Sequence, residues 1–250
     1  QPLPLAGIRV VDLTVVLAGS NATTLLADWG AEVIRVEALK SFLPGTRGSN
    51  IRITKEVVQA NPSWSVAYPN WDPGPRPWNV WPHFQAHGRN KLSMTLDLTQ
   101  EEGKAIFFQL ISVSDVMVEN NVPETIEKLG LDYETLRKAK PDLVMVRMPA
   151  YGLSGPYKNY RSLGAHLEGT AGHTLLRGYP DTDPSMTEDV YLGDAAAAVT
   201  GAFATASALW QTKRTGQGKL VELCQTENLI SFFGEYILDY QMNDRLHTQP

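Results

Sequence analysis

The sequence predicts an α/β fold in which a parallel sheet is flanked by helices. Two observations carry this prediction. Short β-branched apolar runs alternate with longer helical segments along the chain, an order of elements that is typical of α/β folds. The first group, residues 8–37, predicts a strand, a helix and a second strand in succession. Such a unit pairs its two strands in parallel through a right-handed crossover.

Each predicted element follows from a local pattern. The runs IRVVDLT and AEVIRVE predict two buried strands, and Gly30 ends the helix between them. Helices are expected over 100–112, 195–212 and 225–242, and Thr99 is expected to cap the first of these in a capping box with Glu102. The other segments give strands at KLSMTLDL, DVMVEN and KLVELC, and two short helices and a strand within residues 122–152.

An insert at about residues 42–88 interrupts this alternation. Six prolines and four tryptophans fall between Pro62 and Pro82. Proline removes backbone donors, so regular helix or central strand is not expected there. The tryptophans carry large apolar area, so the segment should be ordered. At least two of them are expected to be buried against a partner chain or over the mouth of an active site: Trp64, Trp71, Trp78 and Trp81.

Composition excludes several classes of protein. The 250 residues carry a net charge of −5, and the 22 basic residues are scattered, so we expect no nucleic-acid partner. No apolar run reaches the length of a membrane span, and no secretory signal is visible. The one cysteine, Cys224, cannot form an internal disulfide and is interpreted as a small buried hydrophobe. We therefore expect a cytoplasmic protein with no membrane partner.

The stretch GDAAAAVTG places an acid, Asp194, directly after Gly193 at the start of a small-residue helix. An aspartate there commonly caps the helix, because its oxygen accepts the free N–H groups of the first turn. The rest of the sequence decides whether Asp194 is only a cap.

Five segments together resemble the family III CoA-transferases. They are residues 4–37, 90–98, 114–136, 148–157 and 214–223, and they match the family in order and spacing. The resemblance implies a Rossmann-like large domain, an interlocked dimer, and transfer of CoA from an acyl-CoA to a carboxylic acid without a metal or redox cofactor. It also implies that Asp194 is the nucleophile, through a mixed anhydride and an aspartyl-CoA thioester. Gly193 would admit the thioester and offer its N–H to an oxyanion.

The resemblance also implies a coenzyme A site. Backbone contacts are expected at Leu17 and Ala18, whose alternative role is packing at the start of a helix. Lys40 would replace a family arginine for which this chain has Ala38, although a solvated surface lysine is as good an interpretation. The remaining contacts are expected at Leu96, Asp97, Leu98, Thr99, Asn120, Asn121, Val122 and Lys128. Asn121 stands where the family has an aromatic residue, and Lys128 stands where it has an arginine.

Two alternatives to the CoA-transferase remain open. The chain could be a non-catalytic partner subunit of a two-subunit enzyme, so either a homodimer or a heterodimer is expected. The second alternative is an acyl-CoA racemase of the same fold, which needs an acid where this chain has Gly164; His166 and Glu168 lie nearby but out of register. We expect residues 1–250 to form the large domain, with the family's small domain and returning C-terminal segment absent.

Overall fold

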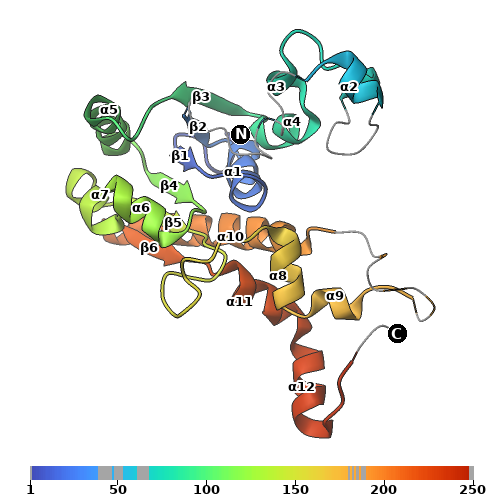
Figure 1. Cartoon of the computed structure of the whole chain (residues 1–250). Coiled ribbons are helices and arrows are strands. Elements are labelled where there is room, and N and C mark those ends of the chain that lie inside the picture. The colour runs from blue at the N-terminus through green and yellow to red at the C-terminus, as the bar shows by residue number, and fades with distance from the viewer. Residues whose placement is uncertain are drawn as a thin grey trace.

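The computed structural model describes residues 2–38, 47, 53–60, 68–179, 181, 183, 186 and 190–247. Their centre is a six-stranded parallel sheet in the order β3-β2-β1-β4-β5-β6 (Figure 1). The α/β prediction is confirmed. Chain order reverses between β1 and β4, and open α/β sheets bind ligands at the carboxyl ends of strands beside such a switch point. The strands are β1 Arg9–Leu13, β2 Glu32–Glu37, β3 Lys91–Thr95, β4 Val116–Glu119, β5 Val144–Arg147 and β6 Lys219–Glu222.

Helices cover both faces of this sheet. The long central helix, α10, spans Leu192–Thr215 and lies beside α1, Ala18–Asp28. The other helices in the main body are α5 Glu101–Ser112, α6 Pro123–Leu129, α7 Tyr133–Ala139, α8 Gly164–Thr170, α9 His173–Leu176, α11 Gln225–Ile230 and α12 Gly234–Asn243. In Figure 1, α12 extends away from the body toward the C-terminus.

Alternation along the strands builds two apolar layers. On β1, Val10 packs in the layer under α1 and α10, whereas Val11 packs in the layer under α5, α6 and α7. Successive side chains of a strand point to opposite faces, so a strand that is covered on both faces must be apolar at every position. This requirement explains the uninterrupted runs VMV on β4 and β5, all of whose residues are buried.

Small residues let α10 approach α1 closely. Ala197, Ala198 and Ala202 of α10 are buried in the same layer as Ala18 and Ala22 of α1. Short side chains allow helix backbones to come nearer than the usual separation of about 8–10 Å. The alanines after Asp194 therefore have a packing role, and they bring the start of α10 to the start of α1.

The insert contains more helix than the sequence predicted. Its described residues form α2 Lys55–Ala60, η2 Pro69–Trp71, α3 Pro77–Val80 and α4 Pro82–Gly88. The prediction of no regular helix was wrong because three of the prolines occupy first helical positions. Proline is tolerated there, since the N–H it lacks would have no partner within the helix.

The tryptophans of the insert have different environments. Trp81 is buried in a small core with Ile53, Val58 and Tyr68 of the same chain, so its cover is not a partner. Trp78 is half-buried and Trp71 is exposed. Trp64 lies outside the described residues. The expected burial is thus found for Trp81 within its own chain, and burial of the others in an assembly stays a prediction.

Three helix boundaries differ from the sequence analysis. Gln100, not Thr99, precedes α5, because the amide and hydroxyl of Thr99 bond Asp97 Oδ1 instead. The predicted 225–242 helix is interrupted by a 3-10 turn at Ser231–Phe233, where Phe233 stacks on His173. Helix α10 begins at Leu192 and not at 195, so Asp194 lies inside its first turn.

Candidate active site

The carboxylate of Asp194 connects two helix N-termini. Asp194 is the third residue of α10, and its side chain does not cap its own helix. Instead, Oδ1 accepts a hydrogen bond of 3.2 Å from the backbone N–H of Ala18, the first residue of α1. Leu17, which precedes α1, offers no side-chain cap. Asp194 therefore supplies to α1 a cap that the α1 sequence lacks, and the predicted cap of α10 is a cap of α1.

Burial sets the charge state of Asp194. Only 7% of the residue is exposed, and Oδ2 has no hydrogen-bond partner within the described part of the chain. Burial raises the pKa of Asp194, the Ala18 N–H lowers it, and the negative charge of Glu168 adds to the rise, so that the pKa is about 6. A carboxyl group with this pKa is mostly ionised at pH 7 yet poorly solvated, which suits a nucleophile.

Two glycines shape the space around this carboxylate. A Cβ at Gly164 would lie 1.9 Å from Asp194 Oδ2, so any other residue there would displace the carboxylate. A Cβ at Gly193 would lie 3.3 Å from Leu229 Cδ2 and 3.6 Å from Leu167 Cβ. Gly193 therefore packs against α11 and α8, and its predicted role as an oxyanion donor remains a prediction.

Asn120 holds the turn between β1 and α1. Its Oδ1 accepts from Val15 N at 2.7 Å, and its Nδ2 donates to Val15 O at 2.9 Å. The next residue, Val16, has φ of 57°, which is an unfavourable conformation for a β-branched side chain. Such strain persists only where the surroundings impose it. Asn120 imposes it by fixing both polar groups of Val15, and the turn then presents Ala18 N to Asp194.

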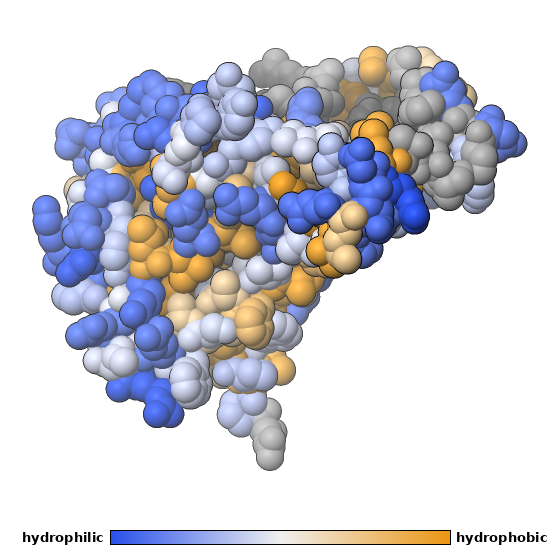
Figure 2. All heavy atoms as spheres, turned by 90° about the horizontal axis from the view of Figure 1, so that it is seen from below, coloured by the Kyte–Doolittle hydropathy of each residue, from blue (hydrophilic) through white to orange (hydrophobic). Residues whose placement is uncertain are grey.

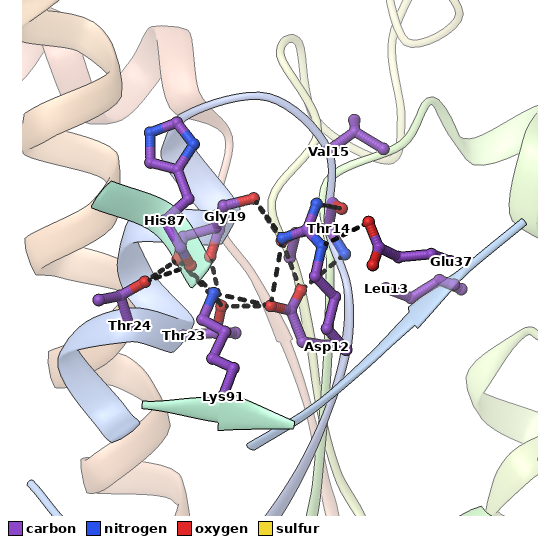
Figure 3. A network of polar contacts seen from close by, with 12 residues as sticks. Asp12, Leu13, Thr14, Val15, Gly19, Thr23, Thr24, Glu37, His87 and Lys91 are labelled. Atoms are coloured by element: carbon purple, nitrogen blue, oxygen red, sulfur yellow. Dashed lines mark hydrogen bonds and ion pairs between the residues drawn. The ribbon is translucent and has the colours of Figure 1, made fainter. Parts of the chain in front are cut away.

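A buried polar network supports the same turn from below (Figure 3). Asp12 of β1 is fully buried, and its Oδ2 accepts from Lys91 Nζ at 2.9 Å and from Thr23 Oγ1 at 2.8 Å. Its Oδ1 accepts from Thr14 N at 2.9 Å. Arg35 NH1 lies 3.7 Å from the same carboxylate. The network joins three strands, β1, β2 and β3, to helix α1.

Asp12 and Lys91 have a partner at each of their polar atoms. Lys91 donates additionally to Ser20 O and Thr23 Oγ1, both at 2.8 Å, so all three of its N–H groups have partners. Burial alone would raise the pKa of Asp12, but the charges of Lys91 and Arg35 and the hydroxyl of Thr14 together lower it to about 2. Asp12 is therefore a permanently ionised anchor for the first turn of α1.

The predicted coenzyme A contacts lie at the carboxyl ends of the strands. Asn121 follows β4 and donates to Leu13 O at 3.3 Å, which places residues 120–122 beside the β1–α1 turn. Residues 96–99 follow β3 at the same edge of the sheet, and Leu96 and Leu98 point into the core. Asp97 and Thr99 bond each other.

The two lysines predicted to contact coenzyme A have less structural support than the strand ends. Lys128 is exposed on α6 and pairs with Glu124 at 2.5 Å, so part of its charge is already matched. Lys40 lies outside the described residues. Within the described residues, no group of three His, Cys, Asp or Glu side chains is arranged to hold a metal ion.

Sequence reasoning missed the buried carboxylate of Glu119, and it considered Glu168 only as an out-of-register acid of a racemase. Glu119, at the end of β4, pairs with Arg147 at 2.7 Å and accepts from Asn121 N at 2.6 Å. Glu168 on α8 accepts from Leu192 N at 2.6 Å. The signal for Glu119 is a charged residue at the end of an otherwise apolar strand. Glu168 carries no such signal, because its partner is 24 residues away.

Known proteins are similar to this chain in sequence and in fold. The chain matches CoA-transferase family III over residues 5–249. Succinyl-CoA–D-citramalate CoA-transferase of Chloroflexus aurantiacus is 33% identical over 249 residues, covering 99% of this chain and 56% of the relative. The alpha subunit of succinyl-CoA–L-malate CoA-transferase from that organism is 33% identical, covering 89% of this chain and 47% of the relative. Its beta subunit also matches, at 31% identity over 96% of this chain and 53% of the relative.

A solved structure agrees with these matches. The crystal structure of a CAIB/BAIF family protein from Brucella suis superposes with a TM-score of 0.82 at 28% identity, covering 100% of this chain and 60% of that chain. The present chain spans about half the length of the curated relatives it matches.

The Asp12 network generates a stability prediction. Asp12→Asn should lower the free energy of unfolding at pH 7 by about 3–5 kcal/mol, because Lys91 and Arg35 lose their buried counter-charge. Since the folded-state pKa of Asp12 is lowered to about 2, its stabilisation is present above pH about 4 and is lost as pH falls toward 2. Urea unfolding of both proteins between pH 7 and 2 measures the difference.

The matched control is Asp28→Asn, which removes a partly exposed carboxylate from Arg89 and should cost about 1 kcal/mol or less. Equal losses for the two variants, or a difference that does not shrink as pH falls below 4, would show that the Asp12 network is not the anchor described above.

Proposed function

The chain belongs to CoA-transferase family III, and on this premise we propose that it moves coenzyme A from an acyl-CoA to a carboxylic acid through Asp194. The observation that carries the proposal is the environment of this carboxylate. One oxygen is held by the Ala18 N–H, and the other has no hydrogen-bond partner within the described residues. The unbonded oxygen, Oδ2, keeps its lone pairs for attack on a thioester carbonyl.

The proposed reaction proceeds in four balanced steps. Asp194 Oδ2 attacks the thioester carbonyl, the C–S bond breaks, and a mixed anhydride and CoA thiolate form. The thiolate attacks the Asp194 carbonyl carbon, giving an aspartyl-CoA thioester and releasing the donor carboxylate. The acceptor carboxylate attacks this thioester, giving a second anhydride and CoA thiolate. The thiolate attacks the acceptor acyl carbon, which gives the new acyl-CoA and restores the Asp194 carboxylate.

Helix N-termini contribute to these steps. The positive end of α1 stabilises the ionised carboxylate and the oxyanion that forms on Asp194 when its carbonyl is attacked. Ala18 N–H is already aimed at this carboxyl group, so little reorganisation is needed during the reaction. Because Oδ2 is buried, we infer that the side chains that cover it move when acyl-CoA binds.

Coenzyme A is proposed to bind along the carboxyl edge of β1, β3 and β4. This placement is supported by the switch point between β1 and β4. The main-chain groups at 13–18, 96–99 and 120–122 would contact the cofactor, and Lys128 would contact a phosphate. Lys128 already forms an ion pair with Glu124, so we assign it a minor share of the affinity for coenzyme A.

The surface supports association with a second chain. Apolar side chains gather on the face shown in Figure 2, where they are bordered by hydrophilic ones. Exposed large apolar residues include Val199, Phe203 and Trp210 on α10 and Ile237, Leu238 and Met242 on α12. Exposed apolar side chains that gather on one face are typical of interfaces. We propose an obligate dimer, and the matches to an alpha and a beta subunit make a heterodimer a reasonable form of it.

Helix α10 is long and apolar enough to cross a membrane by composition, but 56% of its most apolar stretch is buried in the protein. This burial is typical of a core helix.

Racemase activity is less well supported, because Asp194 Oδ2 occupies the space that a side chain at position 164 would need. A non-catalytic partner subunit remains the second candidate, and the intact Asp194 environment counts against it.

Asp194→Asn should reduce CoA transfer by several orders of magnitude, because an amide does not form the anhydride. The fold should lose only about 1 kcal/mol, since the amide oxygen still accepts from Ala18 N–H. Intact-protein mass spectrometry after incubation with acyl-CoA should show an adduct of CoA less one water in the parent protein and not in the variant. Asp142→Asn, which alters an exposed carboxylate paired with Lys140, is the control. Transfer retained within about tenfold, equivalent to about 1.4 kcal/mol in barrier, would overturn the nucleophile.

Coenzyme A should slow amide hydrogen exchange at residues 13–18, 96–99 and 120–122, because the ligand covers these strand ends. Exchange in α7, which packs against α5 and lies outside the proposed site, should not change. Hydrogen–deuterium exchange with and without desulfo-CoA measures this pattern, since that analogue cannot react with Asp194. Protection confined to other segments would move the binding site elsewhere.

A further inference from the structure

Helix α10 begins without a cap of its own. Tyr191, the residue before it, has φ of 52° and makes no side-chain bond to the first turn. The orphan N–H of Leu192, the first residue of α10, is instead bonded by Glu168 Oε1 at 2.6 Å. Glu168 comes from α8, 24 residues earlier in the chain. A buried helix N-terminus needs such a partner, and a carboxylate is the strongest acceptor available.

Glu168 is itself held in place from a third element. It is fully buried, and its Oε2 lies 3.2 Å from His173 Nδ1 and 3.4 Å from an Arg177 guanidinium nitrogen. The His173 ring stacks on Phe233, with centroids 5.1 Å apart. A buried carboxylate with these partners has little freedom to turn away. Glu168 therefore holds the N-terminus of α10 at a fixed place.

We propose that Glu168 is a positioning residue for the CoA-transfer reaction: it caps α10 in place of Tyr191 and thereby holds the Asp194 carboxylate against the N-terminus of α1. The inference rests on the proposed function of Asp194. Glu168 of α8 caps α10, and Asp194 of α10 caps α1. Glu168 also acts on Asp194 through its negative charge.

The groups that face Asp194 and its neighbour Gly193 come from three other helices. Helix α1 contributes the Ala18 N–H. Helix α8 contributes the charge of Glu168 and the bare Cα of Gly164, and α11 contributes the apolar side chain of Leu229 near Gly193. The cations next to Glu168 are Arg177 and, when protonated, His173. Glu168 is the charged group that raises the pKa of Asp194, in addition to burial.

Two substitutions separate the cap from the charge. Glu168→Gln keeps an oxygen that can accept from Leu192 N–H but removes the negative charge. The acid limb of kcat should then move to lower pH by roughly 0.5–1 unit, because Asp194 ionises more easily without a like charge nearby. Glu168→Ala also removes the acceptor, and kcat at pH 8 should fall by roughly 10- to 100-fold through misplacement of Asp194. KM for acyl-CoA should change little in either variant.

Glu222→Gln is the matched control. Glu222 Oε1 also accepts a backbone N–H, from Leu153 at 2.7 Å, but Glu222 does not contribute to the pKa of Asp194. The control should change stability without moving the pH profile of kcat.

A second readout does not depend on activity. The labelled Asp carboxyl groups of the full-length protein are titrated by ¹³C NMR, and the Asp194 signal is assigned by its absence in Asp194→Asn.

The outcomes discriminate between the two claims. A lower Asp194 titration midpoint in Glu168→Gln, with an unchanged midpoint in Glu222→Gln, supports the proposal even if the variants are less stable. An unchanged Asp194 midpoint in Glu168→Gln overturns it. So does a Glu168→Ala variant that is folded by circular dichroism and has full kcat at pH 8. Neither result tests the proposal that Asp194 is the nucleophile. That proposal is overturned separately if Asp194→Asn retains transfer.

Discussion

The hydrogen bond between Ala18 N–H and Asp194 Oδ1 is the contact on which the site depends. It joins the first turns of two helices that are 174 positions apart in the chain, since α1 begins at residue 18 and α10 at 192. It can form only because alanines let the two helices approach. The sheet below supplies the other requirement, since α1 must leave β1 beside the switch point for its N-terminus to face α10. The alanines that pack α10 against α1 therefore also bring Asp194 to the Ala18 N–H.

Two buried aspartates in this protein have pKa values shifted in opposite directions by their surroundings. Asp12 faces the cations Lys91 and Arg35, and its pKa is lowered to about 2. Asp194 is buried with one N–H and a neighbouring carboxylate, and its pKa is raised to about 6. The first arrangement makes an anchor whose charge does not change near neutral pH. The second leaves a carboxylate under-solvated and one oxygen without a partner, which costs stability and is typical of functional sites.

Local signals explain what the sequence could predict. Strand and helix order followed from the period of apolar residues, as in VMV and the segment after Thr99. The place of Asp194 at the start of a small-residue helix was predicted from the sequence, and its role as nucleophile, which the resemblance of five segments implies, stays a prediction. The role of Asn120 was not predicted, because its amide is used to clamp Val15 across 105 positions. Glu168 was discounted for the same physical reason: its partners come from other elements, and no spacing rule marks them. The helices of the insert were missed because proline was interpreted as a breaker and not as a first helical residue.

The central claim is that Asp194 caps α1 while it titrates near neutral pH. The most direct measurement is the ¹⁵N and ¹H chemical shift of the Ala18 amide between pH 4 and 8. We predict that the amide signal shifts upfield as Asp194 is protonated, with a midpoint of about 6, and that Asp194→Asn abolishes this titration. An Ala18 signal that does not change over this range, or that titrates equally in the Asp194→Asn variant, would contradict the account.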